Sequence, residues 1–139
     1  MKNKIPCVLL VDDDETTNYI NLLTVKKSGI ADELIVALNG LEAINTILER
    51  CGDASVRKKT EVPKLILLDI NMPIMNGFEF MEAFRALDAD IQDNIIVIVL
   101  STSLNRRDLD RMKEFGVQGF ISKPLRRDTL QALIDEHFS

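Results

Sequence analysis

Five polar side chains of this sequence stand shortly after apolar runs and are of types that perform phosphoryl chemistry. They are Asp12, Asp13, Asp69, Ser101 and Lys123. Three carboxylates beside one lysine suit a hard divalent cation such as Mg²⁺, whose other ligands are waters and phosphoryl oxygens. A carboxylate beside such a cation can attack phosphorus and form an aspartyl phosphate, while a lysine and a hydroxyl hold the remaining oxygens. The set predicts phosphoryl transfer, provided that the fold brings it together.

The apolar runs in front of these residues read as β-strands. Leu65–Leu68 is aliphatic throughout, as in a strand buried on both faces, and it stops at Asp69. An acid in that position is unfavourable unless a cation or hydrogen bonds compensate for its desolvation. The predicted strands are 8–11, 34–37, 65–68, 95–100 and 119–121.

Helices are predicted between the strands from apolar residues at helical spacing and from residues typical of helix ends. The first begins in the acid run 12–15 and stops at Gly29, and the second begins at Asn39-Gly40 and ends at Gly52. The first helix is marked by Tyr19, Leu22, Leu23 and Val25, and the inward face of the second is expected to carry Leu41, Ile44, Ile47 and Leu48. The remaining helices open at Asn76-Gly77, run from Asn105 to Phe115, and pass through Leu130 to Phe138.

Alternation of strand and helix predicts an α/β fold with a doubly wound, five-stranded parallel sheet and helices on both faces. The first, third and fourth strands are almost continuously aliphatic, so we expect them at the centre and the other two at the edges. This is the flavodoxin-like order 2-1-3-4-5, in three α/β/α layers. Because parallel strands all point the same way, the polar residues that follow them are expected to converge on one rim, where open α/β sheets bind ligands.

The acid run after the first strand divides into two parts. Acids at a helix start are stabilised by the positive end of the helix dipole, which accounts for Asp14 and Glu15. The dipole accounts less well for Asp12 and Asp13, which lie at the strand edge and repel one another unless they share a cation. These first two acids are therefore assigned to the predicted site.

Composition narrows the classes of function. The chain has 139 residues, which suits one domain, and a formal net charge of −5, which argues against a nucleic-acid-binding surface. No apolar stretch approaches the roughly 18 residues of a membrane-spanning helix, and the first residues lack the apolar core of a signal peptide. Cys7 and Cys51 lack a metal-ligand pattern and are expected to be packing residues in a reducing compartment. We therefore expect a cytoplasmic protein without nucleic-acid or membrane partners.

Four motifs, taken together, resemble those of the response-regulator receiver domain of two-component signalling, the CheY-like family. They are Val11-Asp12-Asp13-Asp14, Leu68-Asp69-Ile70-Asn71-Met72-Pro73 with Gly77, Leu100-Ser101-Thr102, and Ser122-Lys123-Pro124. Their order and spacing match over residues 4–138, which implies a single, stand-alone receiver domain without a separate output domain. Two features depart from the family pattern: Thr102 is bulkier than the alanine often found beside the switch hydroxyl, and the connector at 52–63 is longer than usual.

The resemblance implies a phosphorylation site with a bound metal. Asp69 is the expected phospho-acceptor, and Asp12 and Asp13 form the acidic pair. A Mg²⁺ ion, for which Mn²⁺ can substitute, is expected to be held by Asp13, Asp69 and the backbone carbonyl of Asn71, with Asp12 acting indirectly.

The resemblance also implies a switch at the other end of the site. Ser101 and Lys123 are expected to bind the phosphoryl group, and Ser101 and Phe120 are expected to respond to it. The Lys123-Pro124 peptide bond is expected to be cis, as in the family.

By resemblance, the protein is a single-domain response regulator of a phosphorelay rather than an enzyme with an external substrate, although it promotes its own phosphoryl transfer and dephosphorylation. The expected phosphodonor is a histidine kinase or a histidine phosphotransfer protein. The expected output surface comprises the fourth helix at 105–115, the fifth strand and the last helix. Because no effector segment follows Ser139, the signal is expected to leave by protein contact or onward phosphotransfer.

Other functions conflict with particular residues. A haloacid-dehalogenase-type phosphatase would have a second aspartate where Asn71 stands, and a flavodoxin would have a phosphate-binding loop where the acid run stands. An EF-hand loop would have its glycine where Thr17 stands. A receiver-like module that docks a partner without being phosphorylated is the alternative that remains.

Overall fold

The structure of the chain is a computed structural model that describes residues 5–51, 62–102 and 105–138. Residue 4 of the expected domain and most of the 52–63 connector lie outside the described residues. Within them, five strands form one parallel sheet in the order β2-β1-β3-β4-β5, so the predicted fold class and strand order are confirmed. The strands are β1 (Ile5–Val11), β2 (Ala31–Ala37), β3 (Leu65–Leu68), β4 (Ile96–Ser101) and β5 (Gly119–Ser122).

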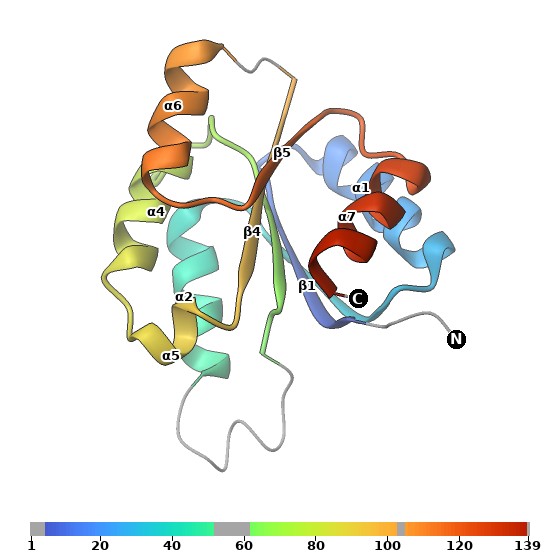
Figure 1. Cartoon of the computed structure of the whole chain (residues 1–139), viewed down its shortest axis with the longest axis horizontal. Coiled ribbons are helices and arrows are strands. Elements are labelled where there is room, and N and C mark those ends of the chain that lie inside the picture. The colour runs from blue at the N-terminus through green and yellow to red at the C-terminus, as the bar shows by residue number, and fades with distance from the viewer. Residues whose placement is uncertain (1–4, 52–61, 103–104, 139) are drawn as a thin grey trace.

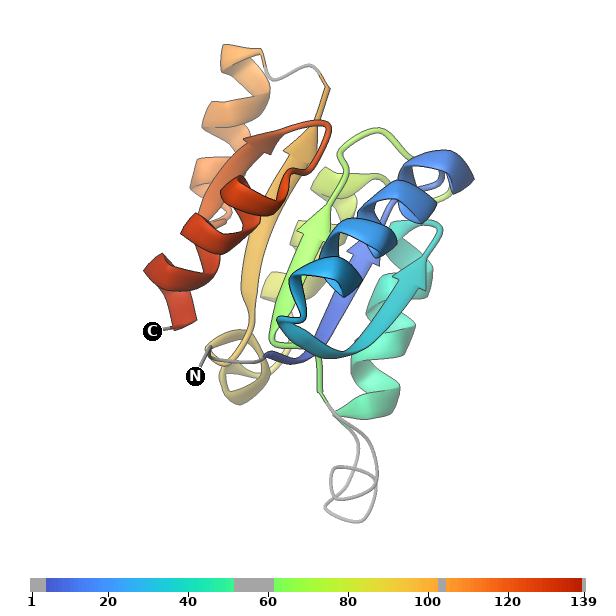
Figure 2. The same cartoon turned by 90° about the vertical axis from the view of Figure 1, so that its right-hand side faces the viewer.

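Helices cover both faces of the sheet. They are α1 (Glu15–Ser28), α2 (Gly40–Arg50), α4 (Gly77–Arg85), α5 (Ala89–Gln92), α6 (Arg106–Glu114) and α7 (Arg127–Phe138). Helices α1 and α7 lie on one face, and α2, α4 and α6 lie on the other (Figures 1 and 2). The short helix α5 was not predicted, because a single turn shows no apolar repeat. Among the described residues, no helix has the length and apolar character needed to cross a membrane.

Each face of the sheet has its own hydrophobic core. Because successive side chains of a strand point to opposite faces, Leu9 and Val11 of β1 pack on the side of α2, α4 and α6. Val8 and Leu10 pack on the side of α1 and α7. This two-sided burial explains why the central strands are aliphatic at every position.

The predicted inward face of α2 is partly wrong, and α1 does not bury all the apolar residues that mark it. Tyr19 is 64% exposed, and α1 buries Asn18 and Asn21 instead. In α2, Leu41 and Leu48 are 43% and 46% exposed. Apolar spacing alone cannot tell which side of a helix meets its neighbours, because that side is set by packing against the sheet and, for α2, against α4.

Short, capped connections carry the chain from the strand ends into the helices. The helices α1, α2, α4 and α6 each begin after an Asp or Asn whose side chain accepts a hydrogen bond from a backbone N–H three residues later. The capping residues are Asp14, Asn39, Asn76 and Asn105. Such caps fix where each helix begins relative to the strand before it.

Candidate functional site

The residues predicted to converge do so at the carboxyl-terminal rim of the sheet. Asp12 directly follows β1, Asp69 directly follows β3, Ser101 ends β4, and Lys123 directly follows β5. One carboxylate oxygen from each of Asp12, Asp13 and Asp69 lies within 4.8 Å of the others. Residues far apart in the chain therefore form one acidic cluster, as the parallel topology predicts.

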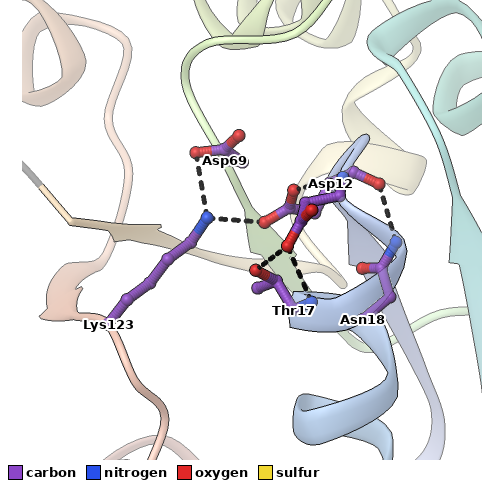
Figure 3. A network of polar contacts seen from close by, with 6 residues as sticks. Asp12, Thr17, Asn18, Asp69 and Lys123 are labelled. Carbon is purple, nitrogen blue, oxygen red and sulfur yellow. Dashed lines mark hydrogen bonds and ion pairs between the residues drawn. The ribbon is translucent and has the colours of Figure 1, made fainter.

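Lys123 joins two of these acids (Figure 3). Its Nζ lies 2.6 Å from Oδ2 of Asp12 and 3.4 Å from Oδ1 of Asp69. Burial alone lowers the pKa of Lys123, but the hydrogen bond from Lys123 to Asp12 and the negative charges of Asp69 and Asp12 outweigh burial and raise that pKa above its usual value. The ammonium group is therefore charged at neutral pH and remains beside Asp69.

Asp69 is a buried carboxylate in an unfavourable electrostatic position. It is 8% exposed, and this burial, together with the negative charge of Asp12, raises the pKa of Asp69 above its usual value. The positive charge of Lys123 and a hydrogen bond from the backbone of Ile70 oppose this rise without cancelling it. A further cation at the cluster would relieve the repulsion between the two acids.

This raised pKa predicts that Asp69→Asn stabilises the protein at pH 7. Well below the unfolded-state pKa of about 3.9, the carboxyl is protonated in both the folded and the unfolded state, and it carries no electrostatic penalty. As the pH rises, the unfolded state releases its proton first, so the stability of the wild-type protein falls through the raised folded-state pKa. Urea unfolding should therefore give Asp69→Asn a higher midpoint at pH 7 and nearly the wild-type midpoint at about pH 3.

The control is Asp88→Asn, because Asp88 is exposed and its side chain makes no capping hydrogen bond with α5. This variant should follow the wild type at both pH values. A midpoint of Asp69→Asn at or below that of the wild type at pH 7 would contradict the assigned electrostatics.

Asp12 and Asp13 have different surroundings. Asp12 is buried, and its two carboxylate oxygens accept hydrogen bonds from the backbone N–H of Asp14 at 2.9 Å and from Lys123 at 2.6 Å. Asp13 is exposed beside the same cluster. Asp14 instead caps α1, where hydrogen bonds from the side chain and the backbone of Thr17 lower the pKa of Asp14. The predicted division of the acid run between site and helix start therefore agrees with the contacts.

The donor set of the cluster fits Mg²⁺. The cluster offers only carboxylate oxygens, which are hard ligands. Mg²⁺ is usually bound by one or two carboxylates and keeps several water ligands. Asp13 is open to solvent, so an ion can keep several waters there. The repulsion between Asp12 and Asp69 gives a cation a direct electrostatic advantage.

A metal titration can separate the roles of neighbouring acids. We expect Asp13→Ala to raise the half-saturating Mg²⁺ concentration by about tenfold or more, because it removes the exposed carboxylate that the cluster offers to a cation. We expect Asp14→Ala to lower the thermal midpoint through loss of the helix cap while leaving the half-saturating concentration near the wild-type value. Equal losses of affinity in the two variants would refute the division.

The loop after Asp69 is shaped by a close backbone approach. A Cβ on Gly77 would lie 2.7 Å from the backbone oxygen of Asp69 and 2.9 Å from Cα of Ile70, so glycine is required there. The N–H of Gly77 donates to the backbone oxygen of Ile70 at 2.8 Å. Asn71 is exposed in this loop, two residues beyond Asp69. Contact with α4 thus holds the loop from which Asn71 presents its backbone.

The residues predicted to form the switch lie on the β4–β5 side of the site. Ser101 is 3% exposed and pairs in register with Ser122, and its backbone oxygen accepts a hydrogen bond from the N–H of Lys123 at 2.9 Å. Phe120 is half-buried and packs against the core on the α6 side. The Lys123-Pro124 peptide bond is cis in the structure.

Sequence reasoning missed Asn18. Its side-chain amide donates to the backbone oxygen of Asp12 at 2.8 Å, so it supports the acidic cluster from within α1 (Figure 3). The available signal was a polar residue one turn before Asn21 on the helix that follows the acid run. The apolar residues around Asn18 marked the helix but did not show which of its polar residues are buried.

Known proteins are similar to this chain over almost its whole length. A family model for the response regulator receiver domain matches residues 8–135. Protein PilH of Pseudomonas aeruginosa is 30% identical over 129 residues, which cover 92% of this chain and 93% of PilH. Hybrid signal transduction histidine kinase G of Dictyostelium discoideum is 28% identical over 130 residues, or 94% of this chain, but the match spans only 3% of that kinase.

Solved structures share the fold. A two-component response regulator from Cytophaga hutchinsonii superposes with a TM-score of 0.84 at 31% identity, over 96% of this chain and 97% of that one. Chemotaxis protein CheY4 of Vibrio cholerae superposes with a TM-score of 0.73 at 26% identity, over 95% of this chain and 98% of that one.

Proposed function

This chain belongs to the response regulator receiver domain family, and from that premise we propose that it accepts a phosphoryl group on Asp69 from a phosphohistidine of a partner protein. The observation that carries the proposal is the position of Asp69. Its buried carboxylate lies at the rim of the sheet, against Lys123 and the acidic pair Asp12 and Asp13. A carboxylate there can act as a nucleophile while a nearby positive charge stabilises the transferring group.

In the proposed transfer, a carboxylate oxygen of Asp69 forms a bond to phosphorus as the phosphorus–nitrogen bond of the donor breaks. The donor imidazole nitrogen keeps the electron pair of the broken bond. Lys123, which lies 3.4 Å from Asp69, would neutralise charge on the phosphoryl oxygens, and the Ser101 hydroxyl would donate a hydrogen bond to one of them. Attack of water on phosphorus would later release inorganic phosphate and restore the carboxylate. We propose that the protein itself promotes this dephosphorylation at the same site.

We propose that Mg²⁺ binds at this site, with Mn²⁺ able to substitute. Asp13, Asp69 and the backbone carbonyl of Asn71 would hold the ion, and Asp12 would act indirectly because both its carboxylate oxygens are engaged by Asp14 and Lys123. When bound, the cation neutralises the charge that develops on the transferring group.

The proposed phosphodonor is a histidine kinase or a histidine phosphotransfer protein. Its support is the family itself and the relatives whose names describe hybrid histidine kinases. We further propose that the domain spans 4–138 and acts in the cytoplasm, a reducing compartment that suits the buried cysteines Cys7 and Cys51. The proposed output face comprises α6, β5 and α7, read by a protein partner, with Ser101 and Phe120 as the switch.

The test is intact-mass analysis after treatment with acetyl phosphate, with and without Mg²⁺. The proposal expects the mass of one phosphoryl group to be added in the presence of the divalent cation and not in its absence. No addition under either condition would favour the alternative of a receiver-like module that docks a partner without being phosphorylated.

A further inference from the structure

Asn18 is a buried polar residue that helix formation does not require. It is 5% exposed on α1, and its Nδ2 donates to the backbone oxygen of Asp12 at 2.8 Å. Its Oδ1 is buried and finds no hydrogen-bond partner among the described residues. The amide orientation follows from chemistry, because the flipped amide would place two oxygens 2.8 Å apart.

The bond from Asn18 is made where β1 leaves the sheet. The last ladder contacts are the N–H of Asp69 donating to the oxygen of Val11 at 2.9 Å, and the N–H of Asp12 donating to the oxygen of Ala37 at 3.0 Å. The backbone oxygen of Asp12 then accepts from the Asn18 amide, a partner six residues along the chain. The side chain of a helix residue therefore supplies the hydrogen bond at the first position beyond the strand pairing.

Further hydrogen bonds hold the turn between β1 and α1. The N–H of Asp14 donates to Oδ1 of Asp12 at 2.9 Å, and the backbone N–H of Asn18 donates to the oxygen of Asp14 at 3.0 Å. Asp13 lies between these anchored residues, and its exposed carboxylate makes no such hydrogen bond within the described part of the chain. The position of the Asp13 carboxylate therefore depends on the turn that Asn18 helps to hold.

A half-satisfied buried amide is unfavourable, since the unpartnered oxygen has lost its hydration without replacement. Leucine has the same branched shape without the unpartnered oxygen, but it could not donate to the backbone oxygen of Asp12. Residues that break a local folding rule in this way are expected at functional sites.

We propose that Asn18 is a positioning residue of the acidic cluster, which holds the backbone of Asp12 so that the neighbouring Asp13 carboxylate and Asp69 converge on a divalent cation. This inference rests on the proposed magnesium site. Asn18 touches neither the ion nor the phosphoryl group and acts through the turn.

The test is a titration of the phosphodonor-free protein with Mg²⁺ alone. Binding is monitored through the amide chemical shifts of residues at the rim of the sheet. Asn18→Leu is expected to raise the half-saturating Mg²⁺ concentration by about tenfold, as loss of a residue that orients metal ligands does. With acetyl phosphate, the same variant should need more Mg²⁺ for half-maximal phosphorylation and approach the wild-type rate at saturating Mg²⁺. Asn18→Ala provides the same measurement if the leucine variant does not fold.

Val25→Ala is the matched control, because Val25 lies on the same buried side of α1 and is 1% exposed. It should lower the thermal midpoint without changing the half-saturating Mg²⁺ concentration. The inference is overturned if both folded Asn18 variants bind Mg²⁺ as the wild type does, or if Val25→Ala weakens binding equally. If the wild type itself does not bind Mg²⁺, the proposed metal site fails and the inference fails with it.

Discussion

Asp69→Asn is expected to remove phosphorylation completely, so that treatment with acetyl phosphate and Mg²⁺ adds no mass to the variant. The amide has almost the shape of the carboxylate but lacks its anionic nucleophile. The substitution leaves the acidic pair in place and leaves Lys123 its 2.6 Å contact with Asp12. A loss of labelling would therefore report the missing nucleophile rather than a collapsed site.

Two features make this experiment decisive. Asp88→Asn makes the same chemical change at an exposed residue beside α5, at the end of the molecule away from the site, and should be labelled like the wild type (Figure 1). Asp69→Asn should also be at least as stable as the wild type at pH 7, so an unfolded variant cannot account for the result. Labelling of Asp69→Asn at the wild-type rate would refute the assignment of the phospho-acceptor.

Ser101→Ala is expected to accept a phosphoryl group on Asp69 and yet lose most of the conformational response. Phosphorylation adds a charge of about −1.5 to −2 and strong acceptor oxygens beside Asp69. We propose that the Ser101 hydroxyl is drawn toward these oxygens and that the Phe120 ring moves into the vacated volume. Removing the hydroxyl leaves the nucleophile intact and cuts this link.

The structure supplies the path for such a response. Ser101 ends β4 and is paired in register with Ser122 of β5, while Phe120 lies two residues earlier on β5 and packs against the core below α6. Arg111 of α6 lies over the Phe78 ring at 3.7 Å from its centroid, so α6 is also tied to α4. Movement of Ser101 would act on β5 first and then on α6.

The measurement is the change in amide chemical shifts on phosphorylation at residues 105–125, compared between variants. The wild type should shift throughout this range, and Ser101→Ala should keep only the shifts closest to Asp69. If the coupling is typical, the response changes partner affinity by about 1–3 kcal/mol, or roughly 5- to 150-fold. The variant should lose most of that change.

Ser122→Ala is the matched control, because Ser122 is the exposed residue paired with Ser101. It should be phosphorylated and should shift like the wild type. A phosphorylated Ser101→Ala that shifts residues 105–125 as fully as the wild type would show that Ser101 is not the coupling group.

The sequence alone determined the architecture and the rim on which the site lies. Both follow from local signals: continuous aliphatic strands require two covered faces, and strand-helix alternation requires a parallel sheet whose carboxyl ends meet. The helix starts were also readable, because Asn39, Asn76 and Asn105 act through contacts three residues away. The same holds for Asp14, whose capping partner Thr17 is equally close.

Only the tertiary structure decided how the site residues pair. Lys123 meets Asp12 across 111 residues of chain, and that contact depends on where β1 and β5 place their ends in the sheet. The same packing left Tyr19 exposed and buried Asn18, against the apolar pattern of α1. Periodicity reports how often apolar residues recur along a helix, whereas the buried side is chosen by contacts with distant segments, and those contacts brought an amide to the backbone of Asp12.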